Sequence, residues 1–173
     1  GRPAVKVMQT RGKDDVMSRH PRPKMAICYD FDGTLAAGHM QEYDYIPQLN
    51  MSSKEFWEEV RQRAQNQKSD EILAYMALMI EKANADRSKG IQITRQAFSD
   101  YAKKVQLFKG VDDWFERINK AGKETGLMVE HYIISSGIRE MIEGTSIARY
   151  FAKIYASSFM YDQHGVAYWP ALA

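Results

Sequence analysis

The amino-acid sequence predicts an α/β fold built around a parallel sheet. Two short apolar runs, at residues 25–29 and 131–134, end in small polar residues and glycine, which is typical of buried strands in such sheets. Apolar side chains recur at helical spacing in the long stretch between these runs. We therefore expect polar groups at the carboxyl ends of neighbouring strands, the edge at which open α/β sheets bind ligands.

The composition is that of an ordinary globular protein. The 173 residues carry 24 basic and 22 acidic side chains, are 45% hydrophobic and include one cysteine, Cys28. This mixture excludes a mainly disordered chain, and one cysteine excludes a disulfide framework or a cysteine-built zinc site. The longest apolar run, residues 72–80, is shorter than the roughly 18 residues of a membrane span. We expect a soluble, cytoplasmic protein without a membrane partner, and we interpret Cys28 as buried and inert.

Basic charge is concentrated near the amino end. Residues 1–24 contain seven basic and two acidic side chains, whereas the remainder contains 17 basic and 20 acidic ones. Pro21 and Pro23 interrupt the segment, which lacks interleaved aromatic residues and a helical apolar pattern. We interpret residues 1–24 as a flexible basic tail and rank contact with nucleic acid or acidic lipid below that interpretation.

Four helices are expected between the two strands. Ser52 and Glu55 form a capping box that begins a helix reaching about residue 67. A second helix starts near residues 69–70 and is followed by a polar loop over 83–89. Thr94 caps a third helix. The fourth spans about 111–120, and the run A-G-K at 121–123 is expected to end it with a glycine and a cation.

The segment after Gly137 completes the predicted sheet. We expect a helix over 138–143, a turn or helix over 146–151 and a third parallel strand over 153–156. Residues 159–161 and 166–169, separated by the turn sequence D-Q-H-G, predict a hairpin.

The run D-F-D-G-T-L at residues 30–35 carries the strongest chemical signal. Two carboxylates, Asp30 and Asp32, stand two positions apart at a strand end, where both can approach one substrate. One can attack as a nucleophile while the other moves protons, and the pair attracts Mg²⁺. Gly33 permits a sharp exit from the strand, and Thr34 adds a hydroxyl to the turn.

This run resembles motif I of the haloacid dehalogenase superfamily. The resemblance implies that Asp30 is the catalytic nucleophile, that Asp32 is the general acid/base, and that both contribute to a Mg²⁺ site. Thr34 would contact the phosphate. His39, Gln41 and Glu42 just after the motif are interpreted as parts of a solvated linker, with contact to the substrate as the alternative.

A second run, Y-I-I-S-S-G at residues 132–137, is similar to motif II of the same superfamily. The resemblance implies that Ser135 hydrogen-bonds the phosphoryl group, as in phosphoserine phosphatase-like members. The amides of Ser136 and Gly137, at the start of a following helix, would bind anionic oxygens as well.

The resemblance implies a fold and a reaction for the chain. It covers residues 24–169 and implies a Rossmann-like parallel sheet core, incomplete in this chain, formed by 25–35 and 107–173. Residues 36–106 would be an inserted α-helical cap of the C1 type that closes over the site. Because Asp32 is retained, the implied activity is phosphatase: Mg²⁺-dependent hydrolysis of a small phosphorylated metabolite through an aspartyl-phosphate.

Two later motifs of the superfamily are absent from the sequence. No candidate follows motif II for the charge-balancing Lys or for the Gly-Asp-x-x-x-Asp-like run that helps to hold Mg²⁺. We therefore expect that the gene product extends past Ala173, that the strand at 25–29 exposes an edge, and that these 173 residues alone hydrolyse phosphate esters weakly or not at all. The alternative function is a catalytically inactive relative that binds without turnover.

Overall fold

A computed structural model describes residues 22–85 and 87–173. The predicted basic tail therefore lies outside the described residues up to residue 21. Four strands and five α-helices share the described chain, together with five short 3-10 turns. The strands are β1 (Lys24–Tyr29), β2 (Met128–Ile138), β3 (Phe151–Tyr161) and β4 (Ala167–Leu172). The α-helices are α1 (Ser53–Gln67), α2 (Glu71–Ala85), α3 (Arg95–Tyr101), α4 (Val111–Glu124) and α5 (Arg139–Glu143). The 3-10 turns are η1 (Met40–Glu42), η2 (Ile46–Leu49), η3 (Arg87–Lys89), η4 (Ala102–Lys104) and η5 (Ala148–Tyr150).

The sheet confirms the predicted α/β class. Its strand order is β1-β2-β3-β4, with β1, β2 and β3 parallel and β4 antiparallel to β3. In the first pair, Lys24 lies beside Met128 and Tyr29 beside Ile133, so both strands run toward the same sheet edge. β1 is one of the two edge strands of the described sheet, which confirms the expected edge position of residues 25–29. No helix among the described residues is long and apolar enough to span a membrane.

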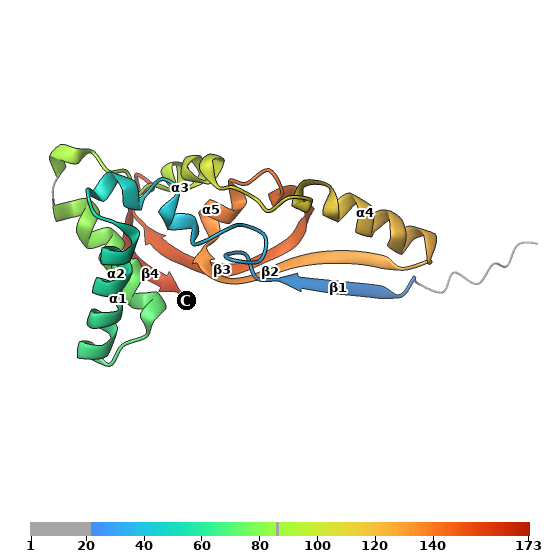
Figure 1. Cartoon of the computed structure of the whole chain (residues 1–173), viewed down its shortest axis with the longest axis horizontal. Helices are drawn as coiled ribbons and strands as arrows, with labels where there is room; N and C mark the ends of the chain where they lie inside the picture. Colours follow the sequence, from blue (N-terminus) through green and yellow to red (C-terminus); the bar gives the residue numbers. More distant parts are fainter. Residues whose placement is uncertain (1–21, 86) are drawn as a thin grey trace, which may run out of the picture.

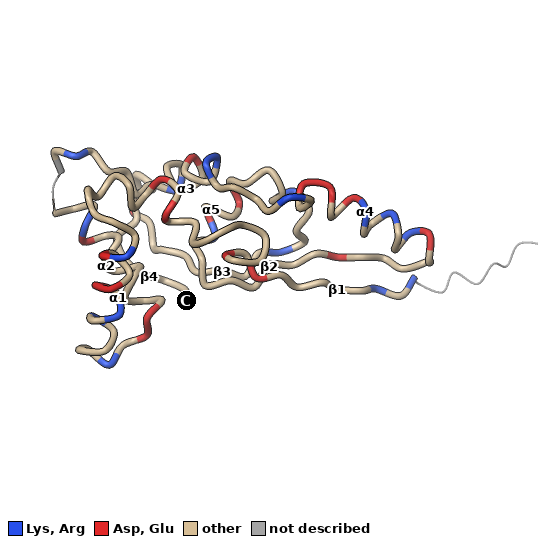
Figure 2. The backbone as a smooth tube through the Cα atoms, in the orientation of Figure 1, with Lys and Arg blue, Asp and Glu red and all other residues tan. Residues whose placement is uncertain are grey.

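Helices cover one face of the sheet and leave the other largely bare. Figure 1 shows α3, α4 and α5 on one side of the strands, with α1 and α2 beyond the end of the sheet. The uncovered side presents apolar side chains to solvent, including Ile134 and Tyr155, which are 58% and 50% exposed. Cys28 is exposed as well, so its interpretation as buried is wrong: the strand is covered on one face only. Charged residues gather along the helices and are sparse along the strands (Figure 2).

Helix α4 is longer than the sequence predicts. It continues through Gly122 to Glu124, and Gly126, with φ +76°, is the glycine that follows the helix in the left-handed conformation. A Cβ atom on Gly122 would lie 2.5 Å from Cγ2 of Val129 on β2. Gly122 is therefore a packing residue that lets α4 approach the sheet closely, and not the helix terminator that its position beside Lys123 indicates.

Helices α1 and α2 form an antiparallel-looking pair at the end of the sheet in Figure 1. Ser52 accepts from the Glu55 amide and Glu55 reaches back to Ser52, which confirms the predicted capping box. Two ion pairs, Arg63–Glu81 and Lys82–Glu59, join the helices across their outer surfaces. Helix α2 runs three residues into the segment expected to be a polar loop, because Ala83 is buried against the core.

The strands after α4 also exceed their predicted lengths. β2 includes Ser135 and Gly137, with an irregularity in the β2–β3 pairing between Ser135 and Ile138. β3 unites the predicted third strand and the first arm of the hairpin in a single strand of 11 residues. The turn is confirmed: Asp162 accepts from the amides of His164 and Val166, and its own amide donates to the Val166 carbonyl.

Candidate active site

The chain turns sharply directly after β1. The carbonyl of Phe31 accepts from the amides of Leu35 and Ala36, at 2.9 and 3.2 Å, and Gly33 adopts φ +76°. The Phe31 ring is fully buried and anchors the turn in the core. Because of this geometry the two carboxylates differ: Asp30 is exposed, with Oδ1 accepting from the Phe31 amide at 2.7 Å, whereas the Asp32 side chain is only 14% exposed.

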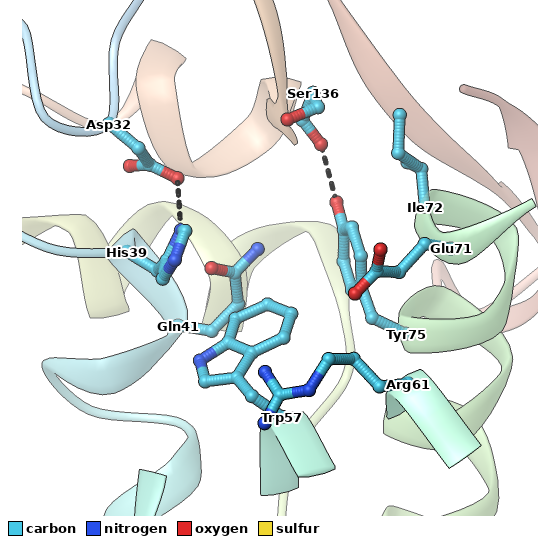
Figure 3. A pocket seen from close by; sticks show the side chains of 9 residues that line it. All are labelled: Asp32, His39, Gln41, Trp57, Arg61, Glu71, Ile72, Tyr75 and Ser136. Carbon is cyan, nitrogen blue, oxygen red and sulfur yellow. Dashed lines mark hydrogen bonds and ion pairs between the residues drawn. The ribbon is translucent and has the colours of Figure 1, made fainter. Parts of the chain in front are cut away.

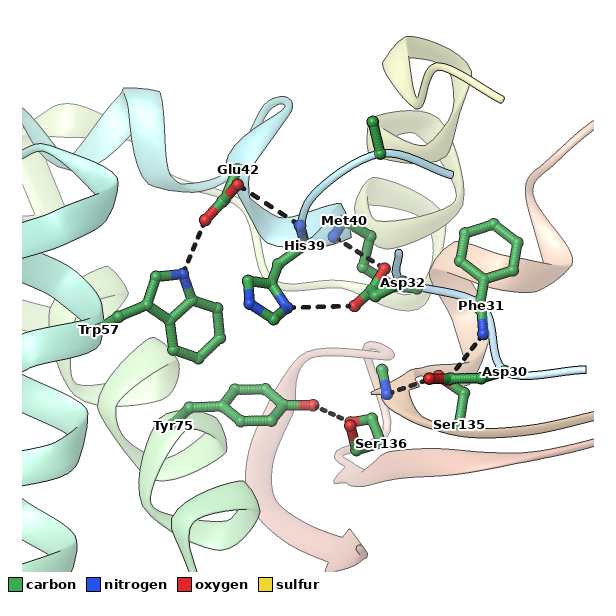
Figure 4. Close-up of polar contacts among 12 residues, drawn as sticks. Asp30, Phe31, Asp32, His39, Met40, Glu42, Trp57, Tyr75, Ser135 and Ser136 are labelled. Atoms are coloured by element: carbon green, nitrogen blue, oxygen red, sulfur yellow. Dashed lines mark hydrogen bonds and ion pairs between the residues drawn. The ribbon is translucent and has the colours of Figure 1, made fainter. Parts of the chain in front are cut away.

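Asp32 lies among groups from the segment that leaves the sheet. Its Oδ1 accepts from the Met40 amide at 3.1 Å, and its Oδ2 is 3.7 Å from Nδ1 of His39 (Figure 4). Burial raises the pKa of Asp32, and the close contact with His39 opposes this only in part. The pKa of His39 is raised in turn, chiefly by its contact with Asp32. The site thus holds a carboxyl group with a raised proton affinity beside an imidazole whose pKa is also raised, a pair that suits proton transfer.

Trp57 of α1 and Glu42 of η1 lie beside His39. The ring centroids of His39 and Trp57 are 4.7 Å apart. The Trp57 indole N–H donates to Oε1 of Glu42 at 2.9 Å, which fixes the orientation of the indole. In Figure 4 the side chains of Trp57, His39 and Asp32 lie one after another from helix α1 toward the sheet edge, with Glu42 beside Trp57.

The segment of motif II meets helix α2. The Tyr75 hydroxyl donates to the carbonyl of Ser136 at 2.7 Å, and the Ser157 hydroxyl donates to the same carbonyl at 3.0 Å. Ser135 Oγ accepts from the Gly137 amide at 3.0 Å. A Cβ atom on Gly137 would lie 2.7 Å from Cε of Met40, so a larger residue there would require the Met40 side chain to move.

One detail of the motif II prediction is wrong. Ser136 and Gly137 belong to strand β2, and helix α5 begins only at Arg139. Their amides therefore do not lie at a helix start, because the irregular strand continues past the serines before the chain turns. The Gly137 amide is also already used by Ser135 within the strand end.

A cavity of about 260 Å³ joins the two motifs to helices α1 and α2 (Figure 3). Asp32 and Ser136 contribute from the sheet edge, and His39 and Gln41 from the segment that follows motif I. Helices α1 and α2 supply the remaining lining residues, Trp57, Arg61, Glu71, Ile72 and Tyr75. The arrangement places a mostly buried acid on one side of a small open cavity and helical side chains on the other.

The predicted site residues are brought together only in part. Asp32 and Ser136 line the cavity, whereas Asp30 follows β1 directly and is not one of the lining residues. Thr34 lines a separate hollow beside α4, together with Phe108 and Trp114. Ser135 lines another hollow, together with Arg139 and Lys153. It therefore does not line the cavity where Tyr75 contacts the carbonyl of Ser136.

Sequence reasoning missed Trp57 and Tyr75, and it ranked substrate contact by Gln41 below a solvated linker. Gln41 is 1% exposed, so the solvated-linker interpretation is wrong for it. Trp57 and Tyr75 belong to helical apolar patterns that indicate burial equally well in a featureless core. Their hydroxyl and indole N–H groups were the available signal, since buried Tyr and Trp usually direct these groups to a partner.

The donor chemistry of the two carboxylates is compatible with Mg²⁺. No group of three or more His, Cys, Asp or Glu side chains among the described residues forms a metal site by itself. Mg²⁺ is commonly held by one or two carboxylates together with water and substrate phosphate, and Asp30 and Asp32 match that donor set. The carboxylate of Asp30 is exposed and is therefore accessible to such an ion.

The fold and this site define an α/β protein whose ligand site lies between the carboxyl edge of a parallel sheet and a pair of helices. The chain belongs to the haloacid dehalogenase-like hydrolase family, whose model matches residues 27–171. The family predicted from the two motifs is thereby confirmed.

Comparisons with individual proteins agree on the fold. An uncharacterized protein of Borreliella burgdorferi is 29% identical over 146 residues, which are 79% of this chain and 50% of that protein. A hydrolase of the same family from Salmonella enterica serovar Typhi has a TM-score of 0.54 at 20% identity, covering 85% of this chain and 45% of its own. A phosphoserine phosphohydrolase-like protein from Francisella tularensis has a TM-score of 0.56 at 16% identity, covering 87% and 64%. A phosphoserine phosphatase with bound substrate has a TM-score of 0.54 at 10% identity, covering 83% and 60%.

The chain spans about half the length of the curated relative that it matches. The same holds for the Salmonella structure, of which it covers 45%. The likenesses therefore place this chain in a family and a fold, and the reaction of the whole protein is a separate question.

Proposed function

We propose that the protein hydrolyses a small phosphomonoester in a Mg²⁺-dependent reaction. The observation that carries the proposal is the position of Asp32: a mostly buried carboxyl group that follows Asp30 by two residues and faces a small cavity between the sheet edge and the helices. Membership of a hydrolase family and the phosphatase-like fold support it.

In the proposed reaction Asp30 attacks phosphorus. The bond from phosphorus to the ester oxygen breaks, and Asp32 gives its proton to that leaving oxygen. Asp32 then takes a proton from a water molecule, which attacks phosphorus and releases inorganic phosphate and the free Asp30 carboxylate. The raised pKa of Asp32 supports the first role because a carboxyl group must be protonated to act as an acid.

The remaining predicted residues would position the phosphoryl group. Ser135, Ser136 and Gly137 would approach it from the end of β2, and Thr34 from the turn after β1. Asp30 and the main-chain carbonyl of Asp32 would hold Mg²⁺, whose charge offsets the repulsion between the nucleophile and the phosphate. Trp57 and Tyr75 would exclude water from the leaving-group side.

Replacement of the nucleophile tests the proposal. In the full gene product, Asp30→Asn should lower Mg²⁺-dependent hydrolysis of p-nitrophenyl phosphate by at least about 10³-fold, because the covalent step is lost. Asp113→Asn, an exposed position on α4, is the matched control and should retain wild-type turnover. Chelation of the metal should reduce wild-type turnover similarly.

Two results would contradict the proposal. Equal Mg²⁺-dependent turnover in Asp30→Asn would remove the nucleophile from the mechanism. Binding of a phosphate analogue such as vanadate, with no turnover of any ester in the wild type, would favour the inactive binding relative instead.

A further inference from the structure

Gln41 is the cavity residue that the proposed reaction does not use. It lies in η1, two residues after His39, and only 1% of its surface is exposed. Its Oε1 atom has no hydrogen-bond partner among the described residues, although buried amides nearly always have one. Figure 3 shows the amide facing the space between His39, Trp57 and Tyr75. An unpartnered buried carbonyl that lines a cavity is a feature that a bound ligand would complete.

The orientation of the amide follows from its neighbour Tyr75. A tyrosine hydroxyl has a single hydrogen to donate, and that of Tyr75 is directed to the Ser136 carbonyl at 2.7 Å. The group of Gln41 that meets the Tyr75 oxygen must therefore be the NH₂ donor. Burial raises the pKa of Tyr75, and the Gln41 side chain lowers it, as a donor group beside the tyrosine oxygen does. With the NH₂ group directed to Tyr75, the carbonyl oxygen is the group left to receive a donor.

The other walls limit what can supply that donor. Trp57 and Ile72 present apolar surface, whereas the charged Arg61 and Glu71 are largely exposed at the rim. Arg61 is already paired with Glu58 at 2.6 Å. The volume of about 260 Å³ lies below the roughly 300 to 1,000 Å³ of pockets that take drug-sized molecules. The space suits a compact ligand with few atoms beyond the phosphate.

We propose that Gln41 is a specificity-determining residue that selects phosphomonoesters of small alcohols carrying a second hydroxyl or an amino group. The donor on the alcohol completes the hydrogen bonding of Gln41 Oε1, while its carbon skeleton packs against Trp57. An alcohol without a donor leaves the carbonyl buried and unpaired, and sites built to pair a polar group reject such analogues strongly. This inference rests on the proposed phosphatase function, because it takes the phosphate to lie near Asp32.

Equilibrium binding of two matched phosphonates tests the inference without turnover. The pair is 3,4-dihydroxybutylphosphonate and n-butylphosphonate, in which a P–C bond replaces the ester and only the hydroxyl groups differ. Binding to the full gene product is measured by calorimetry with Mg²⁺ present. The wild type should bind the dihydroxy compound about 10- to 100-fold more tightly, the gain expected from satisfying a buried acceptor.

The variant Gln41→Met keeps the length of the side chain and removes its polar atoms. It should reduce the preference to less than about twofold, mainly by weakening the dihydroxy compound. Without ligand it should melt at or above the wild-type temperature, because an unsatisfied buried carbonyl has been removed. Gln62→Met, on the exposed part of α1, is the matched control and should retain the wild-type preference.

The outcomes separate this inference from the proposed function. Equal affinity of the wild type for both phosphonates would overturn the inference and leave the phosphatase proposal standing. A preference that persists in Gln41→Met, or a marked loss of melting temperature in that variant, would assign Gln41 a structural role and overturn it as well. Failure of both phosphonates to bind would overturn the inference together with the proposed phosphate site. The wild-type comparison needs no variant and therefore stands even if Gln41→Met does not fold.

Discussion

Polar groups are treated differently in two regions of the molecule, where α4 packs on the sheet and around the cavity. Where α4 packs on β1 and β2, the polar side chains form a continuous chain of hydrogen bonds. The Trp114 N–H donates to the Tyr29 oxygen at 2.9 Å, and the Tyr29 hydroxyl donates to His131 Nδ1 at 2.9 Å. His131 Nε2 in turn donates to Asn119 Oδ1 at 3.0 Å. Around the cavity, Gln41 Oε1 has no partner among the described residues, and the mostly buried Asp32 carboxyl has a raised pKa.

The difference separates stability from function within one small chain. We call the region of Tyr29, Trp114, Asn119 and His131 the relay end, and the region of Asp32 and Gln41 the cavity end. The polar groups of the relay end are hydrogen-bonded and lie among the rings of Tyr29, Phe115 and Phe151. The cavity end keeps polar groups that would be more stable if paired or removed. Regions that bind or react commonly keep such costs, and the rest of the fold must offset them.

The largest expected effect breaks the relay end. Phe115 is fully buried and its ring contacts Tyr29, His131 and Tyr150. Phe115→Ala should lower the free energy of unfolding by about 3–5 kcal/mol, since it removes apolar contacts and leaves a cavity. Urea denaturation measures this, with Phe108→Ala, 43% exposed, as the control expected to cost far less. Similar losses in both variants would show that the relay end is not the stabilising region.

A smaller effect is expected where the helices of the cavity end begin. Ser52→Ala should cost about 1 kcal/mol, because the Glu55 amide loses its acceptor at the start of α1. The exposed neighbour Lys54 provides the control variant Lys54→Ala, which should be within about 0.5 kcal/mol of the wild type. Thermal unfolding of both variants checks the difference. A loss equal to that of Phe115→Ala would mean that α1 contributes to the core as strongly as α4.

The smallest effect is a dependence on pH that sharpens the contrast. Burial lowers the pKa of His131 below its ordinary value of 6.5, so the folded state resists protonation. Above pH 6.5 the residue is neutral in both states, and its contribution to stability is complete. As the pH falls from 6.5 through the lower folded pKa, the unfolded state binds the proton first and stability declines.

Replacement of this histidine isolates its contribution. His131→Gln, which does not titrate, should reduce the decline in the free energy of unfolding between pH 6.5 and 5, measured by urea denaturation at each pH. An unchanged decline in the variant would assign the pH dependence to other groups.

Local patterns predicted much of the fold. The capping box at Ser52, the Thr94 cap and the turn at Asp162 each depend on residues within a few positions of one another, and each is confirmed. The predicted end of α4 was wrong because Gly122 is a glycine for a long-range reason, its close approach to Val129 on β2. A local terminator and a packing glycine have the same appearance in a sequence.

The same division applies to the candidate site. The sequence by itself determined the family, because each of the two motifs is a short run of adjacent residues that can be recognised without knowledge of the fold. It also determined that Asp30 and Asp32 stand at a strand end, because an apolar run and a glycine turn are local features.

Only the tertiary structure decided which side chains share the cavity. It buried Asp32 while leaving Asp30 exposed, and it brought Gln41, Trp57 and Tyr75 from three separate segments to one space. It also left Gln41 Oε1 without a partner, a property of the surroundings that no local pattern contains. The physical reason is that burial and hydrogen-bond pairing depend on distant parts of the chain, whereas strand, turn and cap preferences depend on neighbours in sequence.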